Sequence, residues 1–291
     1  MFIADAVQEF LNDHKTRGSR PRTVEWYSET LTLALRPIFS TPTQDISALA
    51  ISRVMATLME RGISMTTLSG YDRALRAFCN WLQGVGLLER NPHAGRKRTQ
   101  ARWKPKQVLT PDEVQALFTV ARKDKRHQYR LQAILSLFVG LGLRASEVAR
   151  LKLEDVDWNA ATLRIDGKTG YAFLPLERTT FKYLRRYITH ERKGQSLYLF
   201  VHGGKPLCQP SLTRLMSRVG KRAGLTRTLG CHLLRHTFAT LYLKAGGDTF
   251  TLQRLLRHAT PAMTTRYLHY QTDDLRSKLE ALSPLRGVGN K

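Results

Sequence analysis

The sequence predicts a mainly α-helical protein with one small β-sheet, divided into two domains by a basic linker. Apolar residues recur at helical spacing through most of the 291 residues, and a clear period-two alternation occurs only around 162–176. The charge also changes abruptly about one third of the way along the chain. We therefore expect a helical domain at 1–94, a linker at 95–107 and an α+β domain at 108–291, with a tail at 268–291.

The first domain is nearly neutral, whereas the rest of the chain is strongly basic. Residues 1–95 carry 10 Lys and Arg against 9 Asp and Glu, and residues 96–291 carry 37 against 14. A pI near 10.5 indicates a polyanionic partner, and nucleic acid fits better than a membrane surface because no basic amphipathic anchor is evident. The linker suits a phosphate backbone, although a solvated spacer is the alternative. Its cations are Arg96, Lys97, Arg98, Arg102, Lys104 and Lys106.

Composition excludes several classes of protein. No apolar run approaches the ~18–20 residues of a membrane span, and the first residues lack the pattern of a signal peptide. The three cysteines, Cys79, Cys208 and Cys231, are too few and too scattered for a disulfide framework or a zinc knuckle. We expect a cytoplasmic, nucleoid-associated protein.

The first domain should contain four or five helices. Ser47 and Ser64 are typical N-caps, and Thr23 is a possible one before the second helix. Four helices are located by their apolar faces and start signals, at 2–14, 23–35, 47–62 and 64–84. Nothing in this domain resembles a catalytic group. Candidate phosphate contacts, each equally well explained as an ordinary charged helix surface, are Arg20, Arg22, Arg73 and Arg76.

The second domain begins with a strong helix start at Thr110-Pro111-Asp112-Glu113. An apolar helix at 127–141 is broken by Gly140-Leu141-Gly142, and a short helix begins at 143–148. Alternation at 162–165, a turn at 166–170 and an extended run to Leu176 predict a β-hairpin with Lys168 at its tip. Further helices are expected at 177–192, 210–223, 233–245, 249–257, 261–267 and 273–282.

Five side chains of the second domain are unusual for a plain helical fold. Arg144 follows Gly-Leu-Gly-Leu at the end of an apolar helix, and His232 and Arg235 share a helix face. Each alone has an ordinary explanation as a surface charge or a core group. In chain order the five are Arg144, His232, Arg235, His258 and Tyr267.

Together these positions resemble the active site of the tyrosine recombinases, also called the phage integrase or Xer-like family. Leu-Arg-Ala-Ser-Glu at 143–147 resembles the first arginine box, with Lys168 following 24 residues after Arg144. His-Leu-Leu-Arg-His at 232–236 resembles the His-x-x-Arg box, and Tyr267 lies nine residues beyond His258 as in the family. The helical first domain resembles the family's core-binding domain.

The resemblance implies a site-specific DNA recombinase or integrase. Such an enzyme cuts and rejoins strands through a 3′-phosphotyrosyl intermediate and a Holliday junction, with no metal, ATP or other cofactor. Its partner would be a double-stranded recombination site. Four protomers would assemble on two such sites as a homotetramer, and the 268–291 tail of each would dock on a neighbouring protomer. Two alternatives are a type IB topoisomerase and a catalytically silent DNA-binding protein.

The resemblance also implies how the phosphate is held. Arg144 and Arg235 would clamp the two non-bridging oxygens, because guanidinium groups stay charged and offer paired donors. His258 would donate to a phosphate oxygen. One departure from the family lies next to it, since Leu-Arg-His at 256–258 replaces the frequent Leu-Gly-His. Arg257 therefore adds a charge near the site and is a candidate DNA contact.

The remaining roles concern the nucleophile and the protons. Tyr267 would attack the phosphorus, with His232 as base or hydrogen-bond partner. Lys168, the only lysine at its hairpin tip, would protonate the departing 5′ oxygen. Tyr270 is the rival nucleophile, but the nine-residue spacing favours Tyr267.

Two other interpretations of the His232 region are weaker. His232 and His236 are four residues apart and would suit a metal, but the glutamate of the zinc peptidase motif and a third ligand are missing. Cys231 beside His232 would suggest a thiol nucleophile, but adjacent helical residues point apart. We expect a structural cysteine and no metal.

Overall fold

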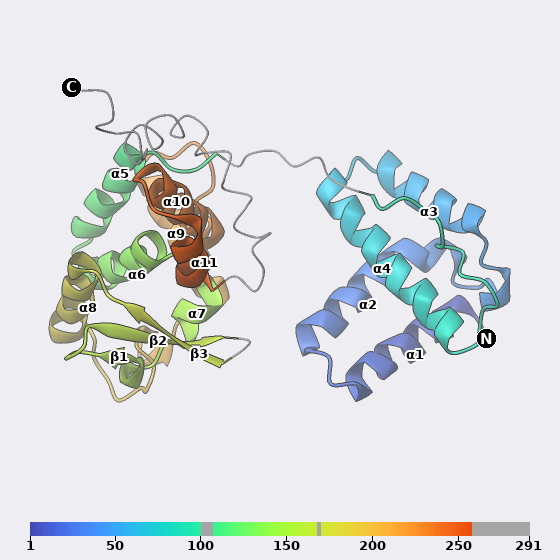
Figure 1. The fold of residues 1–291 in the computed structure, drawn as a ribbon, viewed down its shortest axis with the longest axis horizontal. Coiled ribbons are helices and arrows are strands. Elements are labelled where there is room, and N and C mark those ends of the chain that lie inside the picture. The colour runs from blue at the N-terminus through green and yellow to red at the C-terminus, as the bar shows by residue number, and fades with distance from the viewer. Residues whose placement is uncertain (100–106, 168–169, 258–291) are drawn as a thin grey trace, which may run out of the picture. The chain divides into compact units, whose positions relative to one another are not determined.

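The computed structural model describes residues 1–99, 107–167 and 170–257. The chain divides into two compact units, Met1–Pro105 and Lys106–Lys291 (Figure 1). This division falls inside the stretch 95–107 that the charge pattern sets apart. The predicted helices at 261–267 and 273–282, and the 268–291 tail, lie outside the described residues. None of the helices in the described ranges combines the length with the hydropathy that a membrane crossing needs.

The amino-terminal unit contains four α-helices within residues 1–99, as the apolar periodicity predicts (Figure 1). Ser47 and Ser64 are the expected N-caps, with side-chain oxygens that accept from Ala50 N–H and Thr67 N–H. The core is built from the facing apolar stripes, and Phe10 and Phe78 meet edge to face with ring centroids 5.6 Å apart. The helices are α1 (Ile3–Thr16), α2 (Pro21–Leu35), α3 (Ala48–Glu60) and α4 (Met65–Gly84).

Two details of this unit differ from the expectation. The second helix begins at Pro21 with Arg20 as N-cap, and not at Thr23. Proline suits the first helical position because its ring presets φ and its missing N–H has no partner there. The structure also contains two short 3₁₀ helices after α2, Arg36–Ile38 and Thr43–Asp45, which the sequence does not predict.

The carboxy-terminal unit is built around helix α6 (Gln128–Leu141), which packs against α5, α8 and α10. Its buried residues run without a break from Arg130 to Phe138, as expected of a helix that is covered on all sides. The predicted helix start at Thr110 is confirmed, and Thr110 and Glu113 bond reciprocally there as a capping box. The other helices of this unit are α5 (Pro111–Arg122), α7 (Ala145–Arg150), α8 (Arg178–His190), α9 (Gln209–Arg222), α10 (Cys231–Lys244) and α11 (Thr249–Leu256), with a 3₁₀ turn at Leu153–Asp155.

The predicted hairpin is confirmed as part of a three-stranded antiparallel sheet in the order β1-β2-β3. Strands β2 (Thr162–Gly167) and β3 (Gly170–Pro175) pair from Thr162 with Pro175 to Gly167 with Gly170. Leu163 and Leu174 point into the core, as the alternation predicts. Three strands of two residues each were not expected, because a period of two cannot be detected in so short a run. They are β1 (Val156–Asp157), β4 (Val201–His202) and β5 (Lys205–Pro206).

Candidate active site

The site begins where α6 ends, at a position that only glycine suits. Gly142 has φ +60°, and a Cβ there would overlap the Phe238 ring and lie 2.8 Å from a methyl carbon of Leu256. Both neighbours are buried side chains of the small apolar cluster between α10 and α11. The left-handed glycine therefore ends α6 and turns the chain sharply. This turn places Arg144 at the N-cap of α7.

Arg144 is held by a carboxylate three residues later. Its backbone N–H donates to Glu147 Oε2 at 2.7 Å, and its guanidinium Nη1 donates to Glu147 Oε1 at 2.8 Å. Glu147 is buried, whereas 37% of the Arg144 side chain is exposed. Arg144 is therefore anchored on one side and open to solvent on the other.

Arg235 ties together the three segments that form the site. It lies on α10, is only 3% exposed, and donates from Nη1 to the Gly142 carbonyl at 2.5 Å. Its Nη2 donates to the Leu256 carbonyl at the end of α11, at 2.7 Å. Because Gly142 is two residues before Arg144, Arg235 fixes the same turn that presents Arg144. The two predicted arginines thus belong to one structural cluster, joined by backbone carbonyl groups.

His232 precedes Arg235 by one turn of α10 and is exposed. Its ring meets the ring of His236 edge to face, with centroids 5.0 Å apart. Among the described residues, no group of three His, Cys, Asp or Glu side chains could hold a metal ion. Burial raises the pKa of the neighbouring Cys231 thiol, which disfavours the reactive thiolate. These observations favour the structural interpretation of Cys231.

Arg257, the departure from the family pattern, lies at this cluster. It is the C-cap of α11, with φ +52°. Its Nη2 donates to Glu147 Oε2 at 2.7 Å, and its Nη1 donates to the Leu255 carbonyl at 2.7 Å. The side chain is 11% exposed. Arg257 therefore binds the same carboxylate as Arg144.

Glu147 is the residue of this cluster to which sequence reasoning assigned no role. The sequence did contain a signal for Glu147, because a glutamate three residues after an N-cap position is a common capping arrangement. Its carboxylate lies between two arginines, Arg144 and Arg257. Burial opposes its charged form, but the charge of Arg257 and the donors of Arg144 hold the pKa below its ordinary value. Glu147 is therefore ionised at neutral pH.

The lowered pKa of Glu147 predicts acid sensitivity. Its contribution to stability is complete above the ordinary carboxyl pKa of about 4.3, and it is lost as the pH falls through the lower folded value. We expect Glu147→Gln to lower the free energy of unfolding by about 3 kcal/mol at pH 7, because it leaves Arg257 buried without a counter-charge. Urea unfolding from pH 7 to pH 3 should show this difference shrink only at the acidic end. A difference that stays constant down to pH 3 would contradict the assignment.

The other three predicted catalytic residues, Lys168, His258 and Tyr267, lie outside the described residues. The described neighbours of Lys168 and His258 show where the chain enters the segments that contain these two residues. Gly167 and Gly170 pair across the hairpin that contains position 168. Arg257, which precedes His258, belongs to the arginine cluster itself.

In the amino-terminal unit, Asp72 attaches the start of the predicted linker to helix α4. It is 3% exposed, and its carboxylate lies 3.8 Å from Arg76, 3.9 Å from Arg96 and 3.4 Å from His93. It also accepts from the Thr99 N–H at 3.3 Å. Residues 96–99 are therefore held against α4 by one buried carboxylate.

This attachment borders a groove whose lining contains three arginines and Asp72. Arg73 and Arg76 from α4 and Arg98 from the attached segment line a cavity of about 640 Å³, together with Thr66, Ser69 and Thr99. Arg73 also stacks over the Trp26 ring, 4.7 Å from its centroid. Three of the predicted DNA contacts thus face one groove, which also offers hydroxyl groups. Such a surface suits a phosphate backbone.

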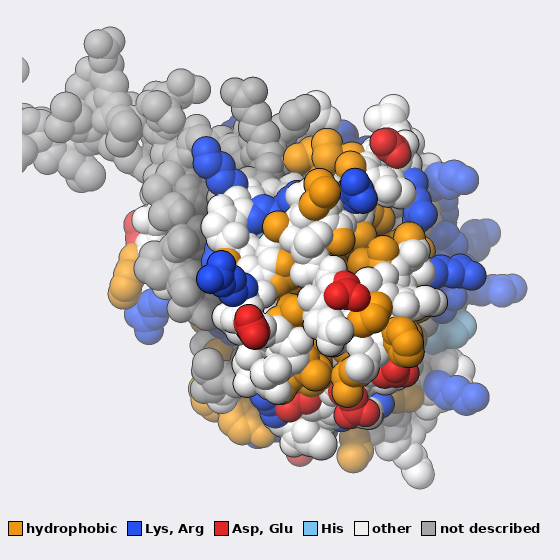
Figure 2. Space-filling model, turned by 90° about the vertical axis from the view of Figure 1, so that its right-hand side faces the viewer, with side chains coloured by type: hydrophobic (Ala, Val, Ile, Leu, Met, Phe, Trp, Pro, Cys, Tyr) orange, Lys and Arg blue, Asp and Glu red, His pale blue; other side chains and the backbone are white. Residues whose placement is uncertain are grey.

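Of the remaining predicted DNA contacts, those that the structure describes do not line this groove. Arg22 pairs with Glu25 at 2.6 Å on an exposed surface, and Arg20 is the N-cap of α2. Arg96 donates to Ser52 Oγ at 2.7 Å. Arg102, Lys104 and Lys106 lie outside the described residues. Figure 2 shows one face of the molecule, on which Lys and Arg side chains alternate with apolar ones and a few acids.

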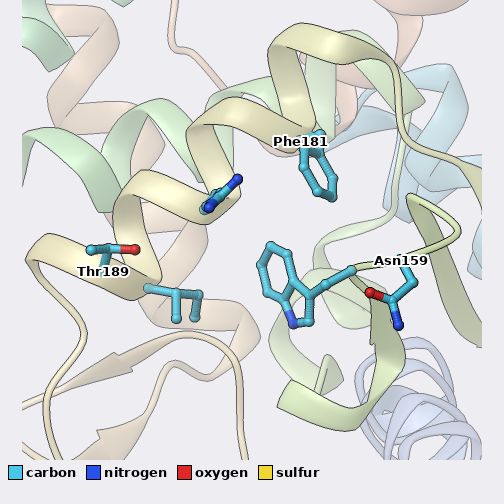
Figure 3. Close-up of a pocket in the computed structure, with 6 residues that line it drawn as sticks. Asn159, Phe181 and Thr189 are labelled. Atoms are coloured by element: carbon cyan, nitrogen blue, oxygen red, sulfur yellow. The ribbon is translucent and has the colours of Figure 1, made fainter.

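A second pocket lies away from these residues, between α8 and the turn after β1. It has a volume of about 430 Å³ and is lined by apolar, amide and hydroxyl groups and one arginine (Figure 3). Phe181 and Thr189 project into it from α8, and Asn159 faces them from the turn. None of the predicted catalytic residues lines this pocket, so it is separate from the arginine cluster.

Comparison with known proteins identifies the family of the chain. Residues 107–273 match the model of the phage integrase family. A tyrosine recombinase XerC of Lacticaseibacillus casei is 30% identical over 243 residues, which cover 80% of this chain and 81% of that protein. A tyrosine recombinase of Pseudothermotoga lettingae is 30% identical over 84% of this chain and 85% of that protein.

Solved structures share the fold. The Tn1549 transposon integrase in complex with transposon right end DNA aligns with a TM-score of 0.83 at 20% identity, covering 97% of this chain and all of that one. A lambda integrase dimer bound to a core site aligns with a TM-score of 0.75 at 19% identity, covering 90% of this chain and 97% of that one. Both structures contain DNA.

Proposed function

Because the chain belongs to the phage integrase family of tyrosine recombinases, we propose that it is a site-specific DNA recombinase that works through a 3′-phosphotyrosyl intermediate and a Holliday junction. One observation carries the proposal. Arg235 binds the carbonyl of Gly142, two residues before Arg144, so that one arginine holds the turn that presents the other. Paired guanidinium groups suit a phosphodiester, whose displacement adds charge to its non-bridging oxygens.

The proposed cleavage is an in-line displacement at phosphorus. The Tyr267 oxygen forms a bond to phosphorus while the bond to the 5′ oxygen breaks. A tyrosine hydroxyl has an ordinary pKa of about 10, so His232 accepts its proton or polarises it. Lys168 supplies a proton to the departing oxygen. His258 donates to a phosphate oxygen. The phosphotyrosyl bond conserves the energy of the diester, so rejoining needs no nucleotide.

DNA binding would involve both units. The groove with Arg73, Arg76 and Arg98 offers phosphate contacts in the amino-terminal unit, whereas most of the net charge of +24 lies beyond residue 95. Each phosphate contact should add about 0.9 to the slope of log affinity against log salt. We further propose that four protomers assemble on two sites, with the 268–291 tail docking in trans. A DNA substrate would place the protein in the cytoplasm, at the nucleoid.

Trapping on nicked DNA tests this proposal. A duplex that contains the recombination site, selected from random DNA by binding, is nicked just beyond the scissile phosphate so that the short cleaved fragment diffuses away. We expect wild-type protein to accumulate covalently on the 3′ end without metal or ATP. Two other outcomes would overturn the proposal. Relaxation of any plasmid without site preference would indicate a type IB topoisomerase, and tight binding without an adduct would indicate a silent DNA-binding protein.

A further inference from the structure

Arg257 occupies a backbone conformation that favours glycine. Its φ is +52°, and Ala161 is the only other non-glycine residue with positive φ within the described residues. This region is costly for any residue with a Cβ, especially a long one. A large side chain here implies that its contacts offset the backbone cost.

Those contacts join Arg257 to the start of α7. The guanidinium is nearly buried, and its Nη2 lies 2.7 Å from Glu147 Oε2, a residue 110 positions earlier in the chain. Its Nη1 binds the carbonyl of Leu255 at 2.7 Å. Burial opposes the charged guanidinium and the charge of Glu147 supports it, with a net lowering of its high pKa. The group remains positively charged at neutral pH.

Arg257 also limits which carboxylate oxygens of Glu147 are available to the Arg144 guanidinium. Glu147 Oε2 already accepts from Arg257 and from the backbone N–H of Arg144, which leaves Oε1 for the Arg144 guanidinium at 2.8 Å. A carboxylate free of Arg257 could instead bind the guanidinium of Arg144 through both oxygens, the geometry that arginine and carboxylate prefer. That arrangement would occupy the donors of Arg144 and neutralise its charge.

We propose that Arg257 is a positioning residue, which occupies Glu147 so that Arg144 keeps its charge and its remaining donors for the scissile phosphate. The inference rests on the proposed function, because it assumes that Arg144 binds phosphate. Arg257 itself acts through Glu147, without touching DNA. It is thus a third arginine of the active site, whose effect on cleavage depends on the shared carboxylate.

The test replaces Arg257 by glycine, the residue that favours a positive φ. Arg257→Gly relieves the positive φ, so the melting temperature should not fall by more than a few degrees. We expect the rate of adduct formation on the nicked site to fall roughly 10-fold or more, the effect of losing one charged hydrogen bond. Affinity for the intact site, measured in a Tyr267→Phe background, should change less than about twofold. Arg257→Lys should recover part of the rate, because it restores the charge.

A double-mutant cycle separates positioning from a DNA contact. In a Glu147→Gln background, adding Arg257→Gly should change the cleavage rate less than about twofold, because the carboxylate through which it acts is gone. An equal loss in both backgrounds, or weaker DNA binding with a smaller salt slope, would show that Arg257 contacts DNA and would overturn the inference.

Arg254 provides a matched control on the same helix. Its side chain is exposed, so Arg254→Ala removes a positive charge without affecting Glu147, and this variant should cleave at the wild-type rate.

The experiments distinguish a failure of the proposed recombinase activity from a failure of the positioning role of Arg257. If wild-type protein forms no adduct on any site, the proposed recombinase activity is wrong. If wild type forms the adduct and Arg257→Gly forms it equally fast, only the positioning role is wrong.

Discussion

Tyr267→Phe should abolish the covalent protein–DNA adduct. The variant lacks the only atom that would bond to phosphorus, so the rate should fall by at least about 10⁴-fold. Binding to the intact site should persist, because the hydroxyl contributes little to a complex held by many phosphate contacts. The measurement is denaturing electrophoresis of end-labelled nicked DNA, with a parallel gel-shift titration. Adduct that persists in Tyr267→Phe would contradict the assignment.

Tyr270→Phe is the matched control. It makes the same chemical change three residues later, at the rival nucleophile, and it should form adduct at the wild-type rate. If instead the adduct disappears in Tyr270→Phe and remains in Tyr267→Phe, Tyr270 is the nucleophile. If it disappears in both, peptide mapping of the wild-type adduct would identify the modified tyrosine.

Arg235→Gln should reduce cleavage by roughly 10³-fold, the cost of removing a fixed donor from a charged transition state. Stability should also fall by about 2–3 kcal/mol, because the carbonyls of Gly142 and Leu256 lose charged donors in a buried site. The rate is measured on the nicked site at a temperature well below the melting transition, and stability by urea unfolding. DNA affinity should change much less than the rate.

The stability and catalytic effects of Arg235 can be separated. Arg235→Lys keeps a positive charge that can reach one carbonyl, so it should recover part of the stability while the rate stays low, because lysine lacks the planar fork. Arg218→Gln makes the same change as Arg235→Gln at an exposed position of α9 and should leave both quantities near wild type. Wild-type cleavage by a well-folded Arg235→Gln protein would remove Arg235 from the mechanism.

Much of the fold could be predicted because its signals are local. The serine caps of α3 and α4 and the capping box of α5 depend on residues three positions apart, and the β2–β3 hairpin depends on alternation over a few residues. The start of α2 was misplaced from Pro21 to Thr23 because two capping signals lay close together. Strands β1, β4 and β5 were missed because their formation depends on partners, and two residues carry no period.

The sequence predicts which residues are candidates for the site, but it does not predict the contacts between them. The spacing of a family motif predicts Arg144, His232 and Arg235 as site residues, and Arg257 departs from that motif. What the motif did not show is that Arg257 binds Glu147 at 2.7 Å. Glu147 received no role, since a buried glutamate and an exposed one look alike in a sequence. The predictions for Lys168, His258 and Tyr267 concern residues outside the described part of the chain.

The sequence by itself determined the helical class, the hairpin, the charge contrast along the chain and the candidate residues of the proposed site. These properties depend on composition and on neighbours within a few positions. The tertiary structure decided that Arg235 holds the Gly142 turn, 93 residues away, and that Arg144 and Arg257 share one carboxylate. Such contacts require helices α6, α7, α10 and α11 to pack together. The energy of a buried charge depends on the partners that this packing supplies.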